Sequence, residues 1–364
     1  MKKHILFLCA LALTNLTADE NCSTLPSSRP CVRGDLPDQT NMYTRISFLY
    51  WQCAEKGLDF ALINTQPQFN SKLTSRHPSF QWDPAFRLLL GTHLPIDNWS
   101  IDLGYSIFYQ DVRDEAHHSF DINSDAAFGS GILSVWTSPG AFLSNNIYAR
   151  WQSAFAKWKI HAHFLDLMLR HDLALGYALS FQPSFGLKMA MLQQRYVLSY
   201  SPGNIVYLPA EETLLSSTVN MNNRSFNLGP GAGCSTRWCL SPRWNLFGSL
   251  SGALLGAHFQ VGRNEFDVSS TASTIIGSYR ISDRYWTYRP QAALSFGMQW
   301  SDCSCSKTSS LHYGFSASYE AQYWWRQNMM LRHYDAPAAQ SHTMSPVQGD
   351  LFFQGLTVDA LFDF

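Results

Sequence analysis

Cysteine is the first residue type in this chain that could do chemistry. The sequence has 8 cysteines, and those beyond the first 20 residues are Cys22, Cys31, Cys53, Cys234, Cys239, Cys303 and Cys305. The "CSC" at 303–305 is closely spaced, but no second Cys or His pair with zinc-site spacing accompanies it. Disulfides form in exported proteins, and an odd number means that at least one thiol is free or pairs with another chain. We therefore predict disulfides or intermolecular cross-links rather than a metal site, and the pairing stays open.

Histidines and glycines also occur in suggestive groups. His117 and His118 lie in the acidic stretch "DVRDEAHHSFD", where a solvated loop is a better interpretation than metal capture. His161 and His163 fall on one face of a predicted strand, which favours a pore-facing or interfacial pair. The "GPGAG" at 229–233 lies on the small-residue face of a strand with no helix after it, so it indicates close packing rather than a phosphate loop.

No catalytic motif accompanies these groups. The chain has no GxSxG elbow, HExxH helix, P-loop or dinucleotide-binding fingerprint. Hydrolases such as phospholipases and proteases need a Ser/His or Asp/His group, and nothing in the sequence brings such a group together. The 26 Lys and Arg against 27 Asp and Glu give no basic excess that would indicate nucleic-acid binding. We therefore expect no enzyme activity, no cofactor and no metal ion.

Charged side chains recur on the polar faces of predicted strands. These candidates for lining a pore are Asp83, Arg87, Asp102, Lys188, Arg237, Arg289 and Glu320, together with Asp359. Rings of one sign set ion selectivity, and these charges are mixed in sign. An internal salt bridge of Arg87 with Asp83 or Asp102, which would brace the structure, is an equally good interpretation.

Strands must position these residues, because apolar residues recur at alternate positions. The pattern is strongest in "FQWDPAFRLLLGT", "WSIDLGYSIFYQ", "YRPQAALSFGMQW", "LHYGFSASYEAQYW" and the terminal "GLTVDALFDF". Weaker runs cover 43–53, 158–170, 179–196, 226–239 and 244–260. The four longest strong runs exceed the usual strand of about five or six residues and match the ~9–11 residues of a tilted membrane strand.

The composition favours a membrane barrel over a soluble β-sandwich. Charged residues are 15% and aromatic residues 14% of the chain, whereas charged residues are roughly 25% of a typical soluble protein. The polar faces hold Gly, Ser, Ala and Gln, and Trp and Tyr gather near the ends of the runs. The long connections, which all fall on one side of the predicted sheet, are 54–79, 111–146, 197–225, 261–286 and 326–348. We therefore predict an all-β, closed antiparallel transmembrane β-barrel of about 10–12 strands with long extracellular loops and short periplasmic turns.

The N-terminus predicts export. Lys2 and Lys3 precede the apolar run Ile5–Leu13, and the small residue Ala18 precedes a polar stretch, as in a signal peptide. The expected organisation is a signal peptide at 1–18, a periplasmic extension at 19–42 and the barrel at 43–364. The expected location is the bacterial outer membrane, with its lipid and the barrel-assembly machinery as partners.

Several ordered segments resemble a known family. They include "FLYWQCAEKGLDFA", "DPAFRLLLGTHLPIDNWSIDLGYSIFY", "LSFQPSFGLKMAMLQQRY", "NLGPGAGCSTRWCLSPRWNLFGSLSGALLGAHFQV" and "GDLFFQGLTVDALFDF". Their order and spacing resemble the Legionella-type major outer-membrane protein family, MOMP-like pore-forming proteins that also occur in Chlamydia-related bacteria. The resemblance implies a porin-like barrel without catalytic residues, with cysteine cross-linking and adhesion in some members.

The expected function is passive diffusion of small hydrophilic solutes through a polar lumen, with a structural role in the envelope. A long loop, 111–146, is expected to narrow this lumen, and a homo-oligomer or disulfide-linked assembly is a further expectation. The alternative is a surface adhesin or a structural barrel with a plugged lumen. It stays open because barrels of about eight strands are filled by side chains, whereas open channels are typical of about 16–18 strands.

The terminal strand generates a test of assembly. Its alternate positions from Leu356 to Phe364 are apolar, and we expect Phe364 to be the signal that the barrel-assembly machinery reads. Deletion of Phe364 should impair membrane assembly far more than the ~1.5–3 kcal/mol of its burial accounts for. A heat-modifiable gel shift of isolated membranes measures the assembled fraction. Normal assembly of the truncated chain would leave Phe364 as a lipid-facing side chain only.

Overall fold

The computed structural model describes most of the region expected to form the barrel. The described residues are 42–64, 73–96, 98–119, 131–137, 148–176, 178–206, 211–269, 275–305, 310–335 and 342–363. The expected signal peptide, almost all of the expected extension, and Phe364 lie outside them. No helix in this described part is long and apolar enough to cross a membrane.

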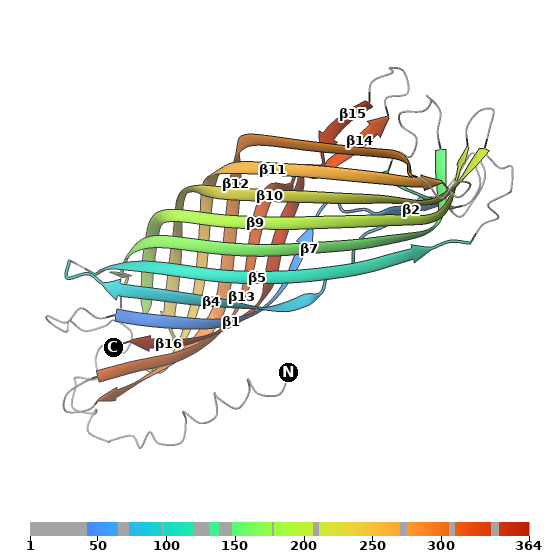
Figure 1. Ribbon diagram of the computed structural model, residues 1–364. Coiled ribbons are helices and arrows are strands. Elements are labelled where there is room, and N and C mark those ends of the chain that lie inside the picture. Colours follow the sequence, from blue (N-terminus) through green and yellow to red (C-terminus); the bar gives the residue numbers. More distant parts are fainter. Residues whose placement is uncertain are drawn as a thin grey trace.

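Ten long strands form one closed sheet within the described residues (Figure 1). In chain order they are β1 (Met42–Glu55), β4 (Trp82–His93), β5 (Trp99–His117), β7 (Tyr148–His171), β9 (Leu179–Val206), β10 (Glu211–Cys239), β11 (Trp244–Ser269), β12 (Ile275–Cys305), β13 (Ser310–Asn328) and β16 (Gly349–Asp363). Each pairs antiparallel with the next, and β16 pairs with β1. The predicted antiparallel barrel is confirmed, at the lower end of the predicted strand range.

The contact between the first and last strands closes the barrel. It runs in unbroken register from Tyr43 opposite Asp363 to Glu55 opposite Leu351. In hydrocarbon every backbone N–H and C=O needs an internal partner, so a spanning sheet cannot leave an open edge. The terminal strand is therefore an essential part of the wall.

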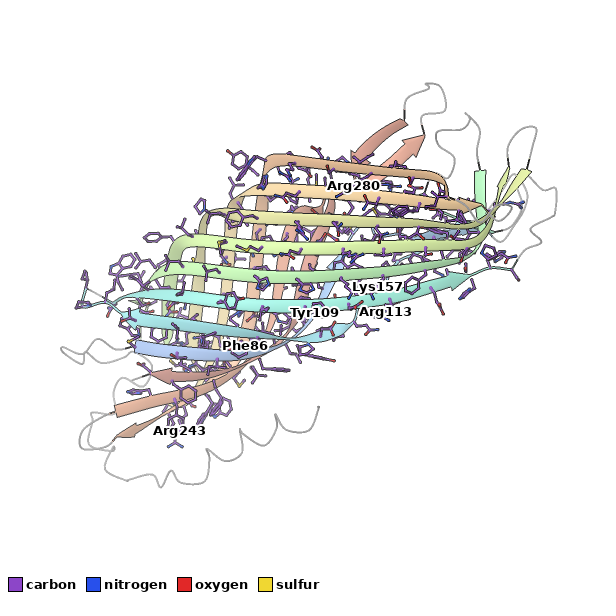
Figure 2. The ribbon with its side chains drawn as sticks, viewed as in Figure 1. Phe86, Tyr109, Arg113, Lys157, Arg243 and Arg280 are labelled. Atoms are coloured by element: carbon purple, nitrogen blue, oxygen red, sulfur yellow. The ribbon has the colours of Figure 1, made fainter. Side chains whose placement is uncertain are left out.

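The outer face carries the apolar band that the alternation predicts. On β5 the exposed side chains run from Ile101 to Tyr109 at alternate positions, and on β16 Leu356 and Val358 face outward. Figure 2 shows Phe86 and Tyr109 on the wall between Arg243 at one end and Arg280 nearer the other. One apolar residue departs from the predicted outward face. Phe80 precedes β4, and its ring packs edge-on against Trp158, with the ring centroids 5.4 Å apart.

The two ends of the barrel differ. At the turn end, where β1 begins and β16 ends, short connections such as 94–98 and 240–243 join the strands. At the opposite loop end the expectation of long loops is wrong for 197–225 and 261–286. There β9 and β10 continue to Val206 and Glu211, and β11 and β12 continue to Ser269 and Ile275. In the first hairpin the outward positions become polar and apolar residues such as Leu198 and Val219 face the core. The outward apolar alternation therefore stops, although the backbone stays paired beyond the apolar band.

Shorter strands complete the described structure. They are β2 (Ala61–Asn64), β3 (Leu73–Arg76), β6 (Gly131–Leu133), β8 (Leu173–Ala174), β14 (Leu331–Asp335) and β15 (His342–Pro346). β2 pairs with β3 and β6, and β6 reaches the wall at Trp151. β14 and β15 form a separate hairpin at the loop end (Figure 1). The main hydrophobic core lies inside the barrel and includes residues of β2 and β6.

Gly355 tests how tightly the closing strands approach. A Cβ atom there would collide with the backbone oxygen of Tyr50 and lie 2.6 Å from Cδ1 of Trp51. We expect Gly355→Val to lower the free energy of unfolding by about 1–3 kcal/mol through overpacking, measured by urea titration of the refolded barrel. Gly252→Val is the control, because a Cβ there is 3.5 Å from its nearest contact. Equal stability of the two variants would contradict the close approach.

Candidate functional site

A polar cavity of about 1310 Å³ occupies the turn end of the lumen. Its lining reaches turn residues such as Pro95, Asn98 and Asp172, so the cavity extends to the end of the barrel. Serine is the most frequent polar side chain around it. Examples are Ser100, Ser106, Ser180, Ser184, Ser316 and Ser318. Such a lining offers hydrogen bonds to a hydrated solute, and apolar side chains such as Leu89, Met168 and Phe247 border the cavity between the polar ones.

Six of the eight predicted pore-lining residues border this cavity. They are Arg87, Asp102, Lys188, Arg237, Glu320 and Asp359. Arg289 does not, because it is buried nearer the loop end, with Nη2 3.3 Å from Sδ of Met329 and its guanidinium over the ring of Phe259. Asp83 is also outside the lining, since it lies opposite Trp51, deeper in the barrel than the cavity. Both residues lie on the inner face of the barrel, and their assignment as pore-lining residues stays a prediction.

Arg87 and Glu320 form the inner end of the cavity. Arg87 donates two hydrogen bonds to the Glu320 carboxylate, at 2.9 and 2.8 Å, and a third from Nε to Ser106 Oγ. Its guanidinium also lies over the ring of Trp51, 5.4 Å from the centroid. The expectation that Arg87 pairs with Asp83 or Asp102 is thus wrong. Its partner is 233 residues away in sequence, and only barrel closure brings the two strands together.

Two further pairs of lumen charges are of opposite sign. Asp102 lies 2.7 Å from Nε of Arg170 and accepts a hydrogen bond from the hydroxyl of Tyr43. Lys188 lies 3.5 Å from Asp166 on the neighbouring strand. Sequence analysis missed Arg170 and Asp166, together with Arg45. All three could have been predicted from the alternation of β1 and β7, because they lie on the same strand faces as buried residues such as Ser47 and Phe164.

An aromatic layer closes the lumen beyond Arg87 and Glu320. We define it as Trp51, Phe108, Phe164, Trp324 and Phe353, all nearly fully buried. Phe353 is its centre, with ring centroids 5.4 Å from Phe108, 5.5 Å from Phe164 and 6.2 Å from Trp51. These side chains come from five different wall strands, so the layer forms only when the barrel closes.

Three inward segments fill the lumen beyond this layer. We call residues 57–64, 131–137 and 327–332 the plug. The chain turns inward at Gly57 and at Arg326, which both have positive φ, of 80° and 53°. Asn328 donates to the backbone oxygen of Lys56 at 2.9 Å, which joins the two turns. The guanidinium of Arg332 lies 4.6 Å from the ring centroid of Trp136, so the segments hold one another.

Polar wall residues anchor the plug through its backbone. Tyr196 and Tyr200 donate to the oxygens of Leu58 and Phe60 at 2.7 and 2.6 Å. Asn223 donates to the oxygen of Gln327 at 2.8 Å. Buried Arg263 donates to the oxygen of Leu331 at 2.9 Å and also to that of Trp136. Because buried backbone carbonyls need partners, these side chains fix the plug in place.

The predicted narrowing loop, 111–146, is only partly correct. Residues 111–117 belong to β5, and 131–137 is the part that enters the lumen in the described structure. Sequence reasoning missed the other two plug segments. Their signal was weak, since Gly57 and the polar pair Gln327–Asn328 resemble ordinary loop residues.

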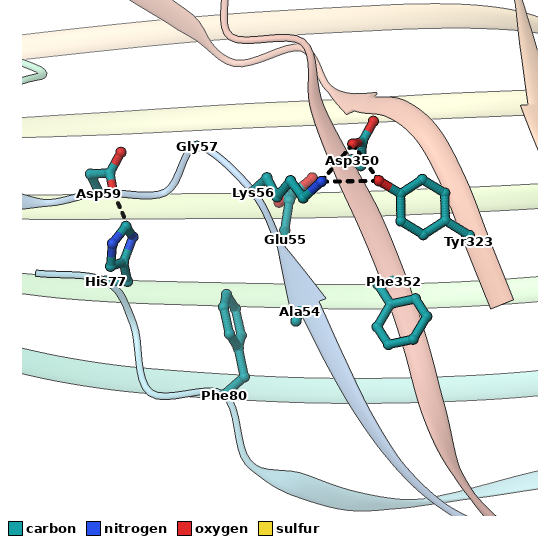
Figure 3. A pocket seen from close by; sticks show the side chains of 10 residues that line it. All are labelled: Ala54, Glu55, Lys56, Gly57, Asp59, His77, Phe80, Tyr323, Asp350 and Phe352. Carbon is teal, nitrogen blue, oxygen red and sulfur yellow. Dashed lines mark hydrogen bonds and ion pairs between the residues drawn. The ribbon is translucent and has the colours of Figure 1, made fainter. Parts of the chain in front are cut away.

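A second pocket, of about 460 Å³, lies where the plug leaves the wall (Figure 3). Lys56 contacts the hydroxyl of Tyr323 and the carboxylate of Asp350, both at 3.1 Å. These hydrogen bonds raise the pKa of the exposed Lys56 ammonium, the Tyr323 bond having the larger effect. His77 lies 2.5 Å from Asp59 on the other side of the pocket. The contacts fasten the start of the plug to β13 and β16.

The predicted cysteine candidates separate into different groups. Cys53 and Cys234 are free thiols, and Cys53 is fully buried on the inner face of β1, where another chain cannot reach it. Cys53 as a cross-link candidate is therefore wrong. Cys239 is disulfide-bonded to a cysteine whose side chain lies outside the described residues. The side chains of the remaining candidates also lie outside them, namely Cys22, Cys31, Cys303 and Cys305.

The histidine pair lies on the outer face. His163 shares a hydrogen bond of 2.8 Å with the hydroxyl of Tyr105, and the ring of His161 packs edge-on against Tyr109. Both histidines belong to the aromatic region of the outer wall, as an interfacial pair would. Within the described residues no group of three or more His, Cys, Asp or Glu could hold a metal ion.

The ion pair at the inner end of the cavity supports a stability test. We expect Glu320→Gln to lower the free energy of unfolding by about 2 kcal/mol, because a half-buried guanidinium loses its carboxylate partner. Urea titration in lipid vesicles measures the change. Glu115→Gln is the control, because Glu115 is exposed and lies 3.6 Å from His117. The Arg87–Glu320 contact is refuted if the two variants unfold at the same urea concentration.

The fold is similar to solved outer-membrane barrels at low identity. The outer membrane protease OmpT from Escherichia coli is 11% identical, with a TM-score of 0.37, over 89% of this chain and 96% of that chain. A major outer membrane protein from Thermus thermophilus is 10% identical, with a TM-score of 0.29, over 90% and 100%. A FadL homologue from Pseudomonas aeruginosa is 8% identical, with a TM-score of 0.28, over 90% of each chain. These similarities are too low to transfer an activity.

Sequence comparison shows the family. No curated protein matches the chain. The sequence model described as "Legionella pneumophila major outer membrane protein precursor" matches residues 35–364, nearly the whole chain. The match agrees with the closed ten-stranded barrel and its outward apolar band. The chain therefore belongs to the Legionella major outer membrane protein family and is an outer-membrane β-barrel.

Proposed function

We propose that the protein is a narrow outer-membrane channel for passive diffusion of small hydrophilic solutes. The observation that carries this proposal is the polar cavity of about 1310 Å³ that reaches the turn end of the barrel. A barrel selected only for rigidity gains stability by filling its lumen with apolar side chains. Here the turn end of the lumen instead keeps a cavity with serines and ion pairs in its lining, which suit water and polar solutes.

The conformation described here is closed. A solute that enters the cavity meets the Arg87–Glu320 pair, then the aromatic layer and then the plug. Conduction therefore requires Phe353 and its neighbours to move aside. Displacement of the plug at its turns, Gly57 and Arg326, would open the remaining path, and it needs no change in the wall strands.

The second candidate is a structural barrel with a plugged lumen. The aromatic layer favours it, because well-packed buried rings are a large source of stability. A structural role in the envelope is compatible with both candidates. No catalytic step belongs to either, and assembly by the barrel-assembly machinery or into homo-oligomers is part of the proposal.

Phe353 offers a direct test of conduction. In planar bilayers we expect the refolded wild-type protein to open rarely and Phe353→Ala to open more often, because removal of the central ring leaves a gap in the aromatic layer. The matched control is Phe352→Ala, since Phe352 is the adjacent residue on the opposite face of β16. Loss of a buried Phe costs about 3–5 kcal/mol, so a gel shift must first show that both variants are folded.

The two candidates give different outcomes. More frequent openings for Phe353→Ala than for Phe352→Ala support a channel that the aromatic layer closes. Absence of openings in the wild type and in both variants, at every voltage applied, would exclude the channel and favour the structural barrel.

A further inference from the structure

Three arginines gather at the mouth of the cavity, at the turn end. Arg45 is three residues from the start of β1, Arg170 is one residue from the end of β7, and Arg237 is two residues from the end of β10. All three line the cavity. We call them the arginine cluster. They come from strands that are not neighbours in the sheet, so they line the cavity mouth from different sides of the barrel.

Two members of the arginine cluster have no fixed counter-ion. Among the described residues, neither Arg45 nor Arg237 forms an ion pair or a side-chain hydrogen bond. The third, Arg170, uses its Nε atom on Asp102, which leaves its terminal nitrogens for other acceptors. This differs from the inner end of the cavity, where Arg87 uses both terminal nitrogens on Glu320.

The electrostatics around Arg237 are unfavourable for a cation. Arg45 and Arg170 lie close enough to repel the Arg237 cation, and Asp172 attracts it. Four carboxylates share this part of the wall. Asp102 pairs with Arg170, Asp172 accepts a hydrogen bond from Gln182 and Asp359 accepts one from Ser316. Asp363 lies on β16, next to the strand of Arg45, and also lines the cavity. Unpaired charges in a partly enclosed site are costly, and an anion between the arginines removes this cost.

We propose that Arg45, Arg170 and Arg237 form a binding site for a small oxyanion at the cavity mouth. Phosphate, free or as the terminal group of a small solute, suits this site because guanidinium groups bind its oxygens with paired, charge-assisted hydrogen bonds. Ser180, which lies opposite Arg237 in the register, lines the same cavity and supplies a hydroxyl. The net charge of the whole chain, −1, gives no hint of this site, because it depends on where the arginines lie.

Phosphate binding by the arginine cluster does not depend on the proposed channel. Only the effect of this binding on solute entry depends on it. In a conducting pore the arginine cluster would favour entry of anions from the turn end. In a closed structural barrel it would still hold phosphate. The experiment must therefore measure binding separately from conduction.

The test uses the full refolded chain in a zwitterionic detergent without phosphate, titrated calorimetrically with inorganic phosphate at low salt. We expect Arg237→Gln and Arg45→Gln each to weaken phosphate binding by about tenfold, the loss typical of one charge-assisted hydrogen bond to a charged group. Arg224→Gln is the matched control, because Arg224 is exposed on the outer face of the same strand as Arg237. A gel shift confirms that each variant is folded.

The outcomes separate the phosphate site from the proposed channel. Phosphate binding that is weakened by both cluster variants and retained in Arg224→Gln supports the site, even if no variant conducts in a bilayer. No binding by the wild type at millimolar phosphate, or equal weakening in Arg224→Gln, would overturn it. In a conducting preparation, the reversal potential in a salt gradient should shift toward cation preference in Arg237→Gln. An unchanged reversal potential would mean that the site binds phosphate but does not set the ion preference of the pore.

Discussion

Pairing of the backbone between β1 and β16 is the contact on which the rest of the structure depends. A membrane sheet has no water at its edges, so its first and last strands must satisfy each other. The register from Tyr43 to Glu55 does this without a bulge. Closure also brings β4 and β13 to the same side of the lumen, where Arg87 meets Glu320. The site is therefore a consequence of closing the sheet.

The number of strands then decides what the lumen can hold. A barrel of about eight strands has room only for its own side chains, and the ten strands here enclose slightly more. The chain fills one part with five aromatic rings and leaves the other as a polar cavity. This division is abrupt, because Arg87 is paired with Glu320 on its cavity side and lies against Trp51 on the other. The Arg87–Glu320 ion pair and the Trp51 ring together mark the boundary between the cavity and the aromatic layer.

The plug shows how polar side chains can hold irregular backbone inside a barrel. Its carbonyls cannot reach water, and they accept hydrogen bonds from Tyr196, Tyr200, Asn223 and Arg263 instead. Each bond joins a different wall position to the plug, so displacement needs several to break together. Such a plug is held in place as one unit, and its displacement would also involve the whole unit.

Most of the fold and a part of the site could be predicted from the sequence. Alternation along β5 or β16 is a local property, because neighbouring side chains point to opposite faces whatever the strand pairs with. That is why the ten strands, the outer apolar band and six of the residues that line the cavity, Arg87 among them, could be predicted from the order of residues. Extended hairpins such as 197–225 were missed because their apolar residues, such as Leu198 and Val219, face the core inside the barrel and not the lipid.

By itself, the sequence determined the strands, their inner and outer faces and the closure of the sheet, since these follow from side-chain period and from the solvation of the backbone. Only the tertiary structure decided that Arg87 pairs with Glu320, that Phe353 meets rings from three other strands, and that Arg45 and Arg237 share one mouth. The reason is physical: contacts across a lumen depend on strand order and stagger around the closed barrel, and neither is visible in the local pattern of any one strand.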